Sequence, residues 1–402
     1  MARKNGKIKV AIIGTGNCAK SLVEGVQYYS EHTNAKTGVM KMDIGGYLAG
    51  DVEFVLGFDI DERKIGLPLG KALEQRPNCA WKIVDTIKCK APVLEAPVID
   101  GYAGLMDSYP EENRFLVSEK LRNSTDMNRV SWTNRLERKW KDKIIKELKA
   151  REVEILVNYL PVGSQKTTEF WAEICLETGI SFVNCIPVFI ASDPAWEQRF
   201  IDAGIPLIGD DMRSQFGASI VSQMLQELAF ERGHHVKAHI QRNVGGNTDF
   251  LNMEDKNRLA SKKISKENVI RAQNEIRGIS TEDSFLHAGP SEYIHYYGDN
   301  KVANFRLELE GFGGSPVLFD AQLSVQDSPN SGGVVIDAIR YLKVARELGV
   351  VGALRGPSAF TQKPPPDQMM FSDAVYECTE LANRRLTDST SKQKPRQIQH
   401  EG

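Results

Sequence analysis

The sequence predicts an α/β protein: a doubly wound parallel sheet completed by the C-terminal segment, with an inserted α+β domain that carries an antiparallel sheet. Two observations predict this fold. In the first half of the chain short apolar segments alternate with helix-like segments, which is the pattern of a parallel sheet. Beyond residue 218 long segments alternate apolar and polar residues, as strands with one buried face do.

The first apolar segment, residues 7–13, is expected to be a strand that runs into a glycine loop and then a helix. The loop reads Gly14, Thr15, Gly16, Asn17, Cys18 and Ala19. Gly14 permits a tight turn, Gly16 lets a pyrophosphate approach the backbone at the helix N-terminus, and Ala19 allows close helix packing. The pattern indicates a dinucleotide site, although a plain glycine turn has the same composition.

The second strand, residues 52–58, ends in Asp59. An acid at this position can accept hydrogen bonds from the ribose hydroxyls and disfavours a 2′-phosphate. The sequence therefore predicts a Rossmann domain that binds NAD in preference to NADP.

Three further strands are expected at residues 153–159, 181–185 and 206–208, and each ends in a polar loop. Ligands of doubly wound sheets bind where strands end, so these loops are expected to contact the ligand. They contain Tyr159, Leu160, Pro161, Ser192 and Asp211. A charged, helix-prone insertion covers about residues 104–150, and the first domain is expected to span residues 1–218.

Residues 219–329 are expected to form the second domain, a catalytic and oligomerisation unit. A helix opens it, and two strands with apolar rows follow, at residues 303–309 and 317–325, joined by a hairpin at Gly311–Gly314. Residues 330–385 continue as a strongly apolar helix, ending at Gly349, that returns to the first sheet. The polar tail, residues 386–402, is expected to be disordered.

Composition excludes several classes of protein. The chain has 402 residues and a formal charge of −2, so it does not resemble a nucleic-acid or membrane-surface binder. No apolar run has the roughly 18 residues of a membrane-spanning helix. The six cysteines form no C-x-x-C pair and are expected to be reduced thiols of a cytoplasmic protein.

The segment from Asn243 to Lys266 carries the most specific chemistry. It places a Gly-Gly-Asn-Thr-Asp turn ahead of Lys262 and Lys266. If these lysines are helical they share one face, and each lowers the pKa of the other unless an anion lies between them. Either case suits a phosphorylated substrate that undergoes proton transfers. Considered singly, Lys262 and Lys266, like Lys301 and Lys363, would be taken for surface lysines, while Asp249 and Asp327 would be taken for helix caps.

Together these segments resemble the myo-inositol-1-phosphate synthase family, nearest to its prokaryotic branch. The resemblance covers roughly residues 8–62 and 150–370, whereas residues 63–149 carry no family motif. It rests on the stretches GTGNCAKSLVEGVQYY, VNYLPVGS, FVNCIPVFIASDP, GDDMRSQFGA, NVGGNTDFLNM, SKKISK, GDNKVANFRLE and DSPNSGGVVIDA, and on the late lysine before PPP.

The resemblance implies an isomerase, a homotetramer built through the second domain, and conversion of glucose 6-phosphate to 1D-myo-inositol 3-phosphate with bound NAD and no net redox. It also implies a cation, divalent or monovalent, near Asp327 or the nicotinamide. By this resemblance, the residues expected to be catalytic are Lys262, Lys266, Lys301, Lys363, Asp211, Asp249 and Asp327. Those expected in the phosphate and substrate loops are Ser214, Gln215 and Asn247. Asp211 and Asp327 are expected to contact the cofactor as well.

Two alternatives stay open on the residues alone. An NAD-dependent sugar-phosphate dehydrogenase with net redox turnover would consume its cofactor stoichiometrically. An NAD-sensing scaffold would bind the dinucleotide and turn nothing over. The four spaced lysines argue against both, because neither alternative needs so many cations beside the dinucleotide.

Overall fold

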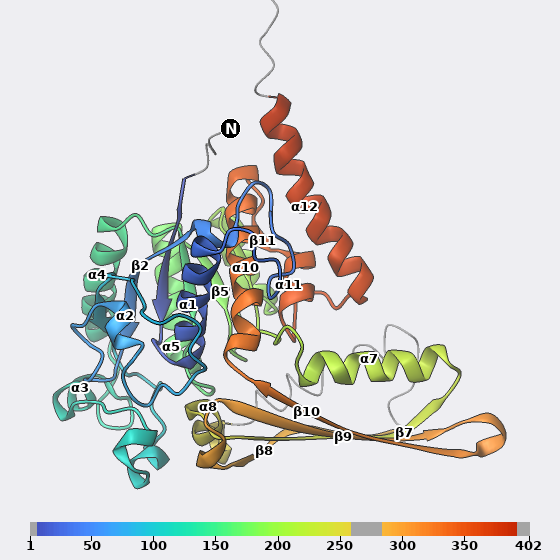
Figure 1. Ribbon diagram of the computed structural model, residues 1–402. Coiled ribbons are helices and arrows are strands. Elements are labelled where there is room, and N and C mark those ends of the chain that lie inside the picture. The colour runs from blue at the N-terminus through green and yellow to red at the C-terminus, as the bar shows by residue number, and fades with distance from the viewer. Residues whose placement is uncertain (1–5, 259–283, 392–402) are drawn as a thin grey trace, which may run out of the picture.

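A computed structural model describes residues 6–258 and 284–391 of the chain. The described residues form a parallel-sheet domain and an elongated second sheet that extends from one end of it (Figure 1). The predicted fold class is confirmed, with one change in the second sheet that is described below.

The parallel sheet has seven strands in the order β11-β6-β5-β4-β1-β2-β3. Their bounds are Ile8–Ile13 (β1), Val52–Asp59 (β2), Val93–Glu95 (β3), Ile155–Asn158 (β4), Ser181–Asn184 (β5), Pro206–Ile208 (β6) and Gly352–Ala353 (β11). The strand order reverses between β1 and β4, which is where doubly wound sheets leave a crevice for ligands. Strand β3, which lies in the region without a recognised motif, was not predicted.

Helices cover both faces of this sheet. On one face α1 (Asn17–Glu31) and α10 (Pro329–Leu348) pack with the aliphatic residues of the strands into one core. On the other face lie α4 (Asn134–Ala150), α5 (Gln165–Thr178) and α6 (Pro194–Asp202). Figure 1 shows that α10, which is far from α1 in sequence, lies in the same layer. The predicted return of the apolar helix to the first sheet is thus confirmed.

The C-terminal segment completes the first domain, as predicted. Strand β11 pairs in parallel with β6, and α11 (Arg355–Thr361) and α12 (Phe371–Ser391) follow it. Helix α12 continues past residue 386, where the sequence predicted a disordered tail to begin. Buried residues at helical spacing, among them Ala374, Cys378 and Leu381, anchor α12 and let its polar last turns propagate.

The second sheet is mixed rather than antiparallel. Its order is β10-β9-β7-β8, with bounds His235–Gly245 (β7), Phe285–Tyr293 (β8), Asn300–Glu310 (β9) and Pro316–Gln326 (β10). The β9–β10 hairpin is antiparallel as predicted, and β7 pairs antiparallel with β9 on its other side, but β7 and β8 are parallel. A parallel pair needs a connection of about a dozen residues or more, and residues 246–284 supply one.

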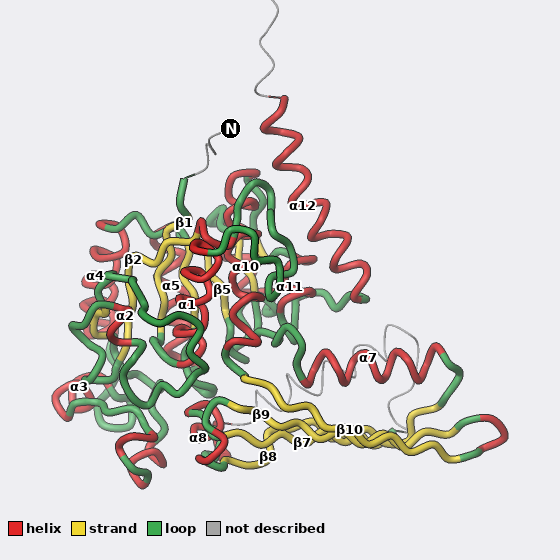
Figure 2. Tube along the Cα trace, viewed as in Figure 1, coloured by secondary structure: helices red, strands yellow, loops and turns green. Residues whose placement is uncertain are grey.

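Helix α7 (Ala218–Glu231) lies along one face of this sheet, and Figure 2 shows the strands extending beneath it as a long twisted ribbon. The inward row Ala303, Phe305 and Leu307 packs against Val221 and Leu225 of α7. The apolar residues at every second position of β9 therefore form one buried face, as the sequence indicated, and this face packs against α7.

The remaining helices among the described residues are short. They are α2 (Leu69–Ala72), α3 (Glu119–Thr125) and α8 (Thr248–Asn252), with 3-10 turns at Ala49–Asp51, Gly104–Ser108, Glu111–Asn113, Lys256–Arg258, His295–Tyr297 and Phe312–Gly314. Within the described ranges, no helix has both the length and the apolar character needed to cross a membrane.

Candidate active site

A cavity lies where the ends of the parallel strands meet the second sheet. Its walls come from the glycine loop, the ends of β2 and β4, the loop after β6, the first turn of α7, strand β7, helix α8 and the N-terminus of α10. Both domains therefore contribute to one site, which lies at the reversal of strand order.

The geometry of the glycine loop fits a dinucleotide. Gly14 has φ +83°, and a Cβ atom there would lie 2.7 Å from the carbonyl oxygen of Tyr159. At Gly16 a Cβ would meet no atom within 4 Å, so its backbone borders open space at the N-terminus of α1. The Tyr159 hydroxyl is buried and has no hydrogen-bond partner among the described residues. The loop thus leaves room for a pyrophosphate at a helix N-terminus.

Two residues of the glycine loop face the interior rather than the cavity. Ala19, in the first turn of α1, lies in the core, as its expected role in close helix packing requires, and Thr15 is fully buried. The Thr15 backbone N–H donates to Asp59 Oδ2 at 2.8 Å, and its hydroxyl donates to the same oxygen. Thr15 therefore joins the glycine loop to the end of β2.

Asp59 has a role that the sequence did not reveal. Its Oδ2 accepts from Thr15, while its Oδ1 accepts from the backbone N–H groups of Ile60 (2.7 Å) and Asp61 (2.9 Å). A carboxylate offers about four acceptor positions, and these donors already use them. Asp59 lines the cavity, but it also holds the glycine loop in place.

Replacing Asp59 by alanine is expected to weaken binding of both NAD and NADP. The loss for NAD should be roughly 1–3 kcal/mol, the scale of a charged hydrogen bond, because the loop loses its anchor. Calorimetry on the variant, with exposed Glu62→Ala as the control, measures this. Tighter NADP binding with unchanged NAD binding would instead mean that Asp59 acts only by repelling a 2′-phosphate.

Residues of the 63–149 region hold the glycine loop from outside. The buried Lys64 ammonium donates to Thr15 O (2.8 Å) and to Asn78 Oδ1 (3.0 Å), and Asn17 Oδ1 accepts from the N–H groups of Cys79 and Ala80. Burial lowers the pKa of Lys64 from its usual value. Sequence reasoning missed these residues, because no local pattern ties them to a loop some 60 positions earlier.

Two of the predicted lysines line the cavity, and each is paired with a predicted carboxylate. The Lys301 ammonium forms an ion pair with Asp327. The Lys363 ammonium lies 2.9 Å from Asp211 Oδ1 and donates to Met212 O at 2.8 Å. The Lys363 and Asp211 side chains are 11% and 1% exposed, so this pair is held in a fixed place with little water around it.

Asp299, two residues before Lys301, was not singled out by the sequence. Its carboxylate accepts from Ser328 Oγ (2.7 Å), Ser328 N (3.1 Å) and Asn247 Nδ2 (3.1 Å), and so joins three segments that line the cavity. Burial, with a smaller effect of the Asp327 charge, raises the pKa of Asp299 to about 6. The available signal was its place in the polar turn that leads into β9, two residues before Lys301.

Asp210 and Asp211 have separate roles, although they are adjacent. The Asp210 carboxylate is buried and accepts from the N–H groups of Ile190, Ala191 and Ser192 and from the Ser192 hydroxyl. Burial raises the pKa of Asp210 to about 6. Ser192, predicted to contact the cofactor, thus anchors its own loop to Asp210 and is not among the residues that line the cavity.

The N-terminus of α7 opens into the cavity. Gly217 is its N-cap and provides no side-chain cap, and Ser214, Gly217, Ala218 and Ser219 line the cavity there. Uncapped N–H groups at a helix N-terminus favour an anion. Gln215 lies elsewhere, beside Asn330 in a neighbouring hollow.

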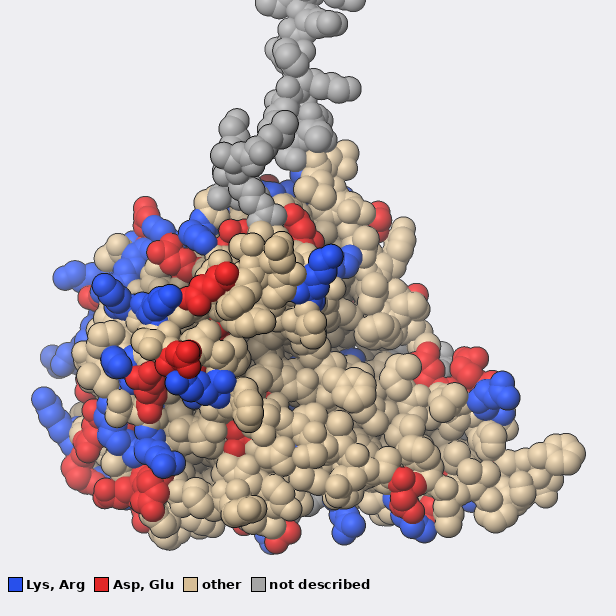
Figure 3. All heavy atoms as spheres, viewed as in Figure 1, with Lys and Arg blue, Asp and Glu red and all other residues tan. Residues whose placement is uncertain are grey.

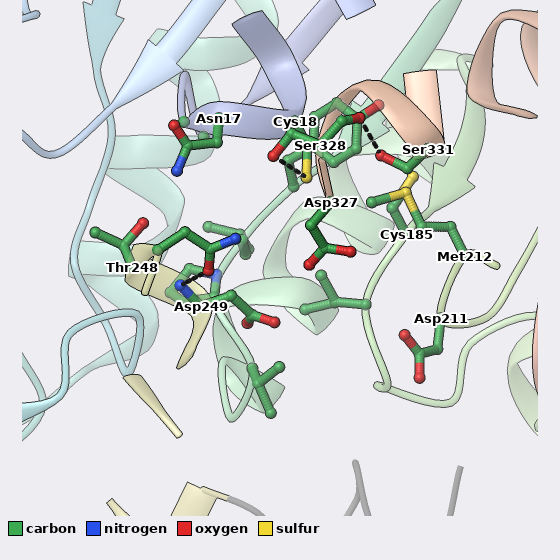
Figure 4. Close-up of a pocket in the computed structure, with 18 of the residues that line it drawn as sticks. Asn17, Cys18, Cys185, Asp211, Met212, Thr248, Asp249, Asp327, Ser328 and Ser331 are labelled. Carbon is green, nitrogen blue, oxygen red and sulfur yellow. Dashed lines mark hydrogen bonds between the residues drawn. The ribbon is translucent and has the colours of Figure 1, made fainter. Parts of the chain in front are cut away.

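Most of the predicted site residues come together. Figure 4 shows Asp211, Asp249 and Asp327 around one space, with Asn17 and Cys18 of the glycine loop above them. Burial raises the pKa of the Cys18 thiol to about 12, which disfavours the reactive thiolate. Lys262 and Lys266 lie outside the described residues. The predicted site residues that line the cavity are Gly14, Gly16, Asn17, Cys18, Asp59, Tyr159, Leu160, Pro161, Asp211, Ser214, Asn247, Asp249, Lys301, Asp327 and Lys363.

The described part of the chain contains no group of three or more His, Cys, Asp or Glu side chains that could hold a metal ion. Next to Asp327 the positive charge comes from Lys301. The expected cation therefore stays a proposal; here it would need further oxygen ligands from the backbone or the substrate.

Known proteins resemble this chain over nearly its whole length. The family described as Myo-inositol-1-phosphate synthase matches residues 217–328. The curated relative "Inositol-3-phosphate synthase" of Corynebacterium glutamicum is 41% identical over 90% of this chain and 94% of its own length. The protein of the same name from Mycolicibacterium smegmatis is 39% identical over 92% of this chain and 96% of its own length.

Solved structures share the fold. A myo-inositol-1-phosphate synthase-related protein from Thermotoga maritima superposes with a TM-score of 0.75 at 23% identity, covering 94% of this chain and 98% of that one. An inositol-3-phosphate synthase from Caenorhabditis elegans has a TM-score of 0.67 at 15% identity, covering 98% and 90%. Identity of about 40% to the curated bacterial relatives across nine-tenths of the sequence is decisive: this chain belongs to the myo-inositol-1-phosphate synthase family.

Proposed function

We propose that this chain is an inositol-3-phosphate synthase that converts D-glucose 6-phosphate to 1D-myo-inositol 3-phosphate with NAD and without net redox. The observation that supports it best is the joining of a dinucleotide loop with two carboxylate-paired lysines, Lys301 and Lys363, in one cavity. Family membership at about 40% identity points the same way.

NAD would lie along the glycine loop, with its pyrophosphate at Gly16 and its adenosine half beside Asp59. Leu160 and Pro161, across the strand-order reversal, would border the nicotinamide half. When bound, NAD would supply a hydride acceptor for substrate C5, and the same hydride would later be returned to C5. Asp327 and Ser328 at the start of α10 border the same space from the other side.

The residues of the chain account for the remaining chemistry. A ketone at C5 of the open-chain sugar acidifies C6, and the resulting enolate attacks the C1 aldehyde. Negative charge then develops on O5 and O1, and Lys301 and Lys363 would stabilise it as fixed cations in a poorly hydrated cavity. Lys262 would move the proton at O5 and Lys266 would bind O1 or the phosphate. The uncapped N-terminus of α7 is a second phosphate anchor.

The function is tested by incubating purified protein with glucose 6-phosphate and a catalytic amount of NAD. We expect an inositol phosphate to accumulate far beyond the amount of NAD, without lasting absorbance of reduced cofactor. Identification of the product by NMR and mass spectrometry completes the assay. Product limited to one equivalent per NAD would support the sugar-phosphate dehydrogenase, and NAD binding without product would support the scaffold.

We also propose that the protein is a cytoplasmic enzyme and that it forms a homotetramer through the second sheet. Exposed apolar side chains gather on edge strand β10 and its turn, where Phe312 is 100% and Leu318 60% exposed, and on α7, where Leu228 is 59% exposed. Figure 3 shows charges of both signs dense over the first domain and sparse over the second. Light scattering at micromolar concentration tests this assembly, and a monomer there would contradict it.

A further inference from the structure

A row of buried polar side chains runs between α7 and β7 and ends at the cavity. Ser222 and Gln226 belong to α7, while His239, Gln241 and Asn243 occupy alternate positions on β7 and so share one face. All five are at most 5% exposed. Gln241 and Asn243 line the cavity, and the other three lie behind them.

Hydrogen bonds connect these side chains in series. The Asn243 amide lies 2.7 Å from the carbonyl oxygen of Gly289, and its oxygen lies 2.9 Å from Gln241 Nε2. Gln241 Oε1 lies 2.8 Å from the Ser222 hydroxyl. Ser222 Oγ lies 3.0 Å from Nε2 of His239.

One backbone carbonyl determines the direction of the whole series. The Gly289 oxygen can only accept, so the Asn243 nitrogen must face it and the Asn243 oxygen must face Gln241. The Gln241 nitrogen is then the donor to Asn243, and its oxygen accepts from the Ser222 hydroxyl. The hydrogen of that hydroxyl is thereby committed, so its oxygen must accept from Nε2–H of His239.

The far end of the series agrees with this direction. With its hydrogen on Nε2, neutral His239 presents a bare Nδ1, and the Gln226 side-chain nitrogen lies 2.9 Å from it. Burial lowers the pKa of His239 to about 4, so the ring stays neutral near pH 7. Every bond in the series then joins one donor to one acceptor.

This direction of hydrogen bonding leaves Gln241 with one side-chain N–H that can donate into the cavity. Its amide nitrogen carries two hydrogens, one committed to Asn243, and the other has no acceptor among the described residues. Gln241 is bonded to Ser222, which lies one turn beyond the uncapped first turn of α7 that borders the same cavity. An N–H donor at that place suits an oxygen at the phosphate end of a sugar phosphate.

We propose that Gln241 is a specificity-determining residue that donates a hydrogen bond to an oxygen at the phosphate end of the substrate. Asn243, oriented by the Gly289 carbonyl, keeps the Gln241 nitrogen rather than its oxygen facing the cavity. Ser222 is a positioning residue that holds the Gln241 oxygen and so fixes the side chain in place. This inference rests on the proposed sugar-phosphate substrate, and it adds to the lysines a neutral recognition group that the charge pattern of the sequence did not reveal.

The test measures binding to the NAD-loaded protein by calorimetry, with glucose 6-phosphate and inorganic phosphate as separate probes. Gln241→Leu should weaken glucose 6-phosphate binding by about tenfold, the effect of one lost hydrogen bond to a charged or polar acceptor. NAD affinity and the melting profile serve as checks of folding. Equal weakening for inorganic phosphate assigns the contact to the phosphate group, whereas weakening for the sugar phosphate alone assigns it to a neighbouring hydroxyl.

The positioning role has its own pair of variants. Ser222→Ala, which removes the hydroxyl that holds the Gln241 oxygen and so loosens the side chain, should raise KM for glucose 6-phosphate severalfold with little change in kcat. Ser222→Thr, which keeps the hydroxyl, should restore the parent KM. Parent-like binding of both probes by folded Gln241→Leu overturns the proposal. Absence of inositol phosphate production by the unmutated protein would instead overturn the proposed function, and the binding measurement would still decide the role of Gln241.

Discussion

Replacing Lys363 by methionine is expected to lower turnover of glucose 6-phosphate by roughly 10²–10³-fold, the usual effect of removing one fixed oxyanion donor. The reason is geometric: its ammonium is held by Asp211 Oδ1 at 2.9 Å and Met212 O at 2.8 Å, on the wall of the cavity. NAD binding should change much less, since the glycine loop lies across the cavity. Steady-state assay of product formation measures the loss.

The matched control is Lys343→Met. Lys343 is also partly buried, at 16% exposure, and paired with Glu154, but it is not among the residues lining the cavity. Turnover by the Lys343→Met variant should stay within about threefold of the parent, because partly exposed ion pairs contribute little to stability. Since Lys363→Met leaves the Asp211 charge buried, the Asp211→Asn/Lys363→Met variant checks folding. A folded double variant with parent-like turnover would remove Lys363 from the mechanism.

Replacing Lys262 by alanine is expected to lower turnover by at least 10²-fold, within the roughly 10²–10⁴-fold range of a proton-transfer group. Lys262 lies outside the described residues, so this expectation rests on the S-K-K-I-S-K sequence and on the setting beside Lys266. The comparison is Lys263→Ala, which removes the same charge one position along the chain and should change turnover little.

The two variants must be compared at equal folding and equal NAD affinity. If both lose activity by the same factor, or if Lys262→Ala stays within about threefold of the parent, Lys262 is not the proton-transfer group. The lysines of this segment would then attract the phosphate through their summed charge, and both variants should show that as a salt-dependent rise in KM.

The sequence by itself predicted the strands of the first sheet that carry the loops of the site, because each is a short apolar run followed by a polar turn. The glycine loop, the end of β2 at Asp59, the hairpin after β9 and the start of α10 all fall where local patterns placed them. Such features depend on neighbouring residues, whose spacing is readable in the chain. The resemblance then identified the family, and it singled out five charged residues that line the cavity: Asp211, Asp249, Lys301, Asp327 and Lys363.

Local patterns failed where the answer depended on residues distant in the chain. Strand β3 is too short to show a period, and the parallel pairing of β7 with β8 depends on the path of the chain between them. The extent of α12 depends on the core that anchors its first turns.

Only the tertiary structure decided how the charged groups are partnered. Lys363 and Asp211 are 152 positions apart, and Lys301 and Asp327 are 26 apart, so no spacing rule could pair them. The same holds for Asp59, whose carboxylate holds the glycine loop, and for the Gly289 carbonyl that orients Gln241 through Asn243. A buried polar group needs a partner wherever the fold can supply one, and which partner that is depends on how the sheets and helices bring distant segments together.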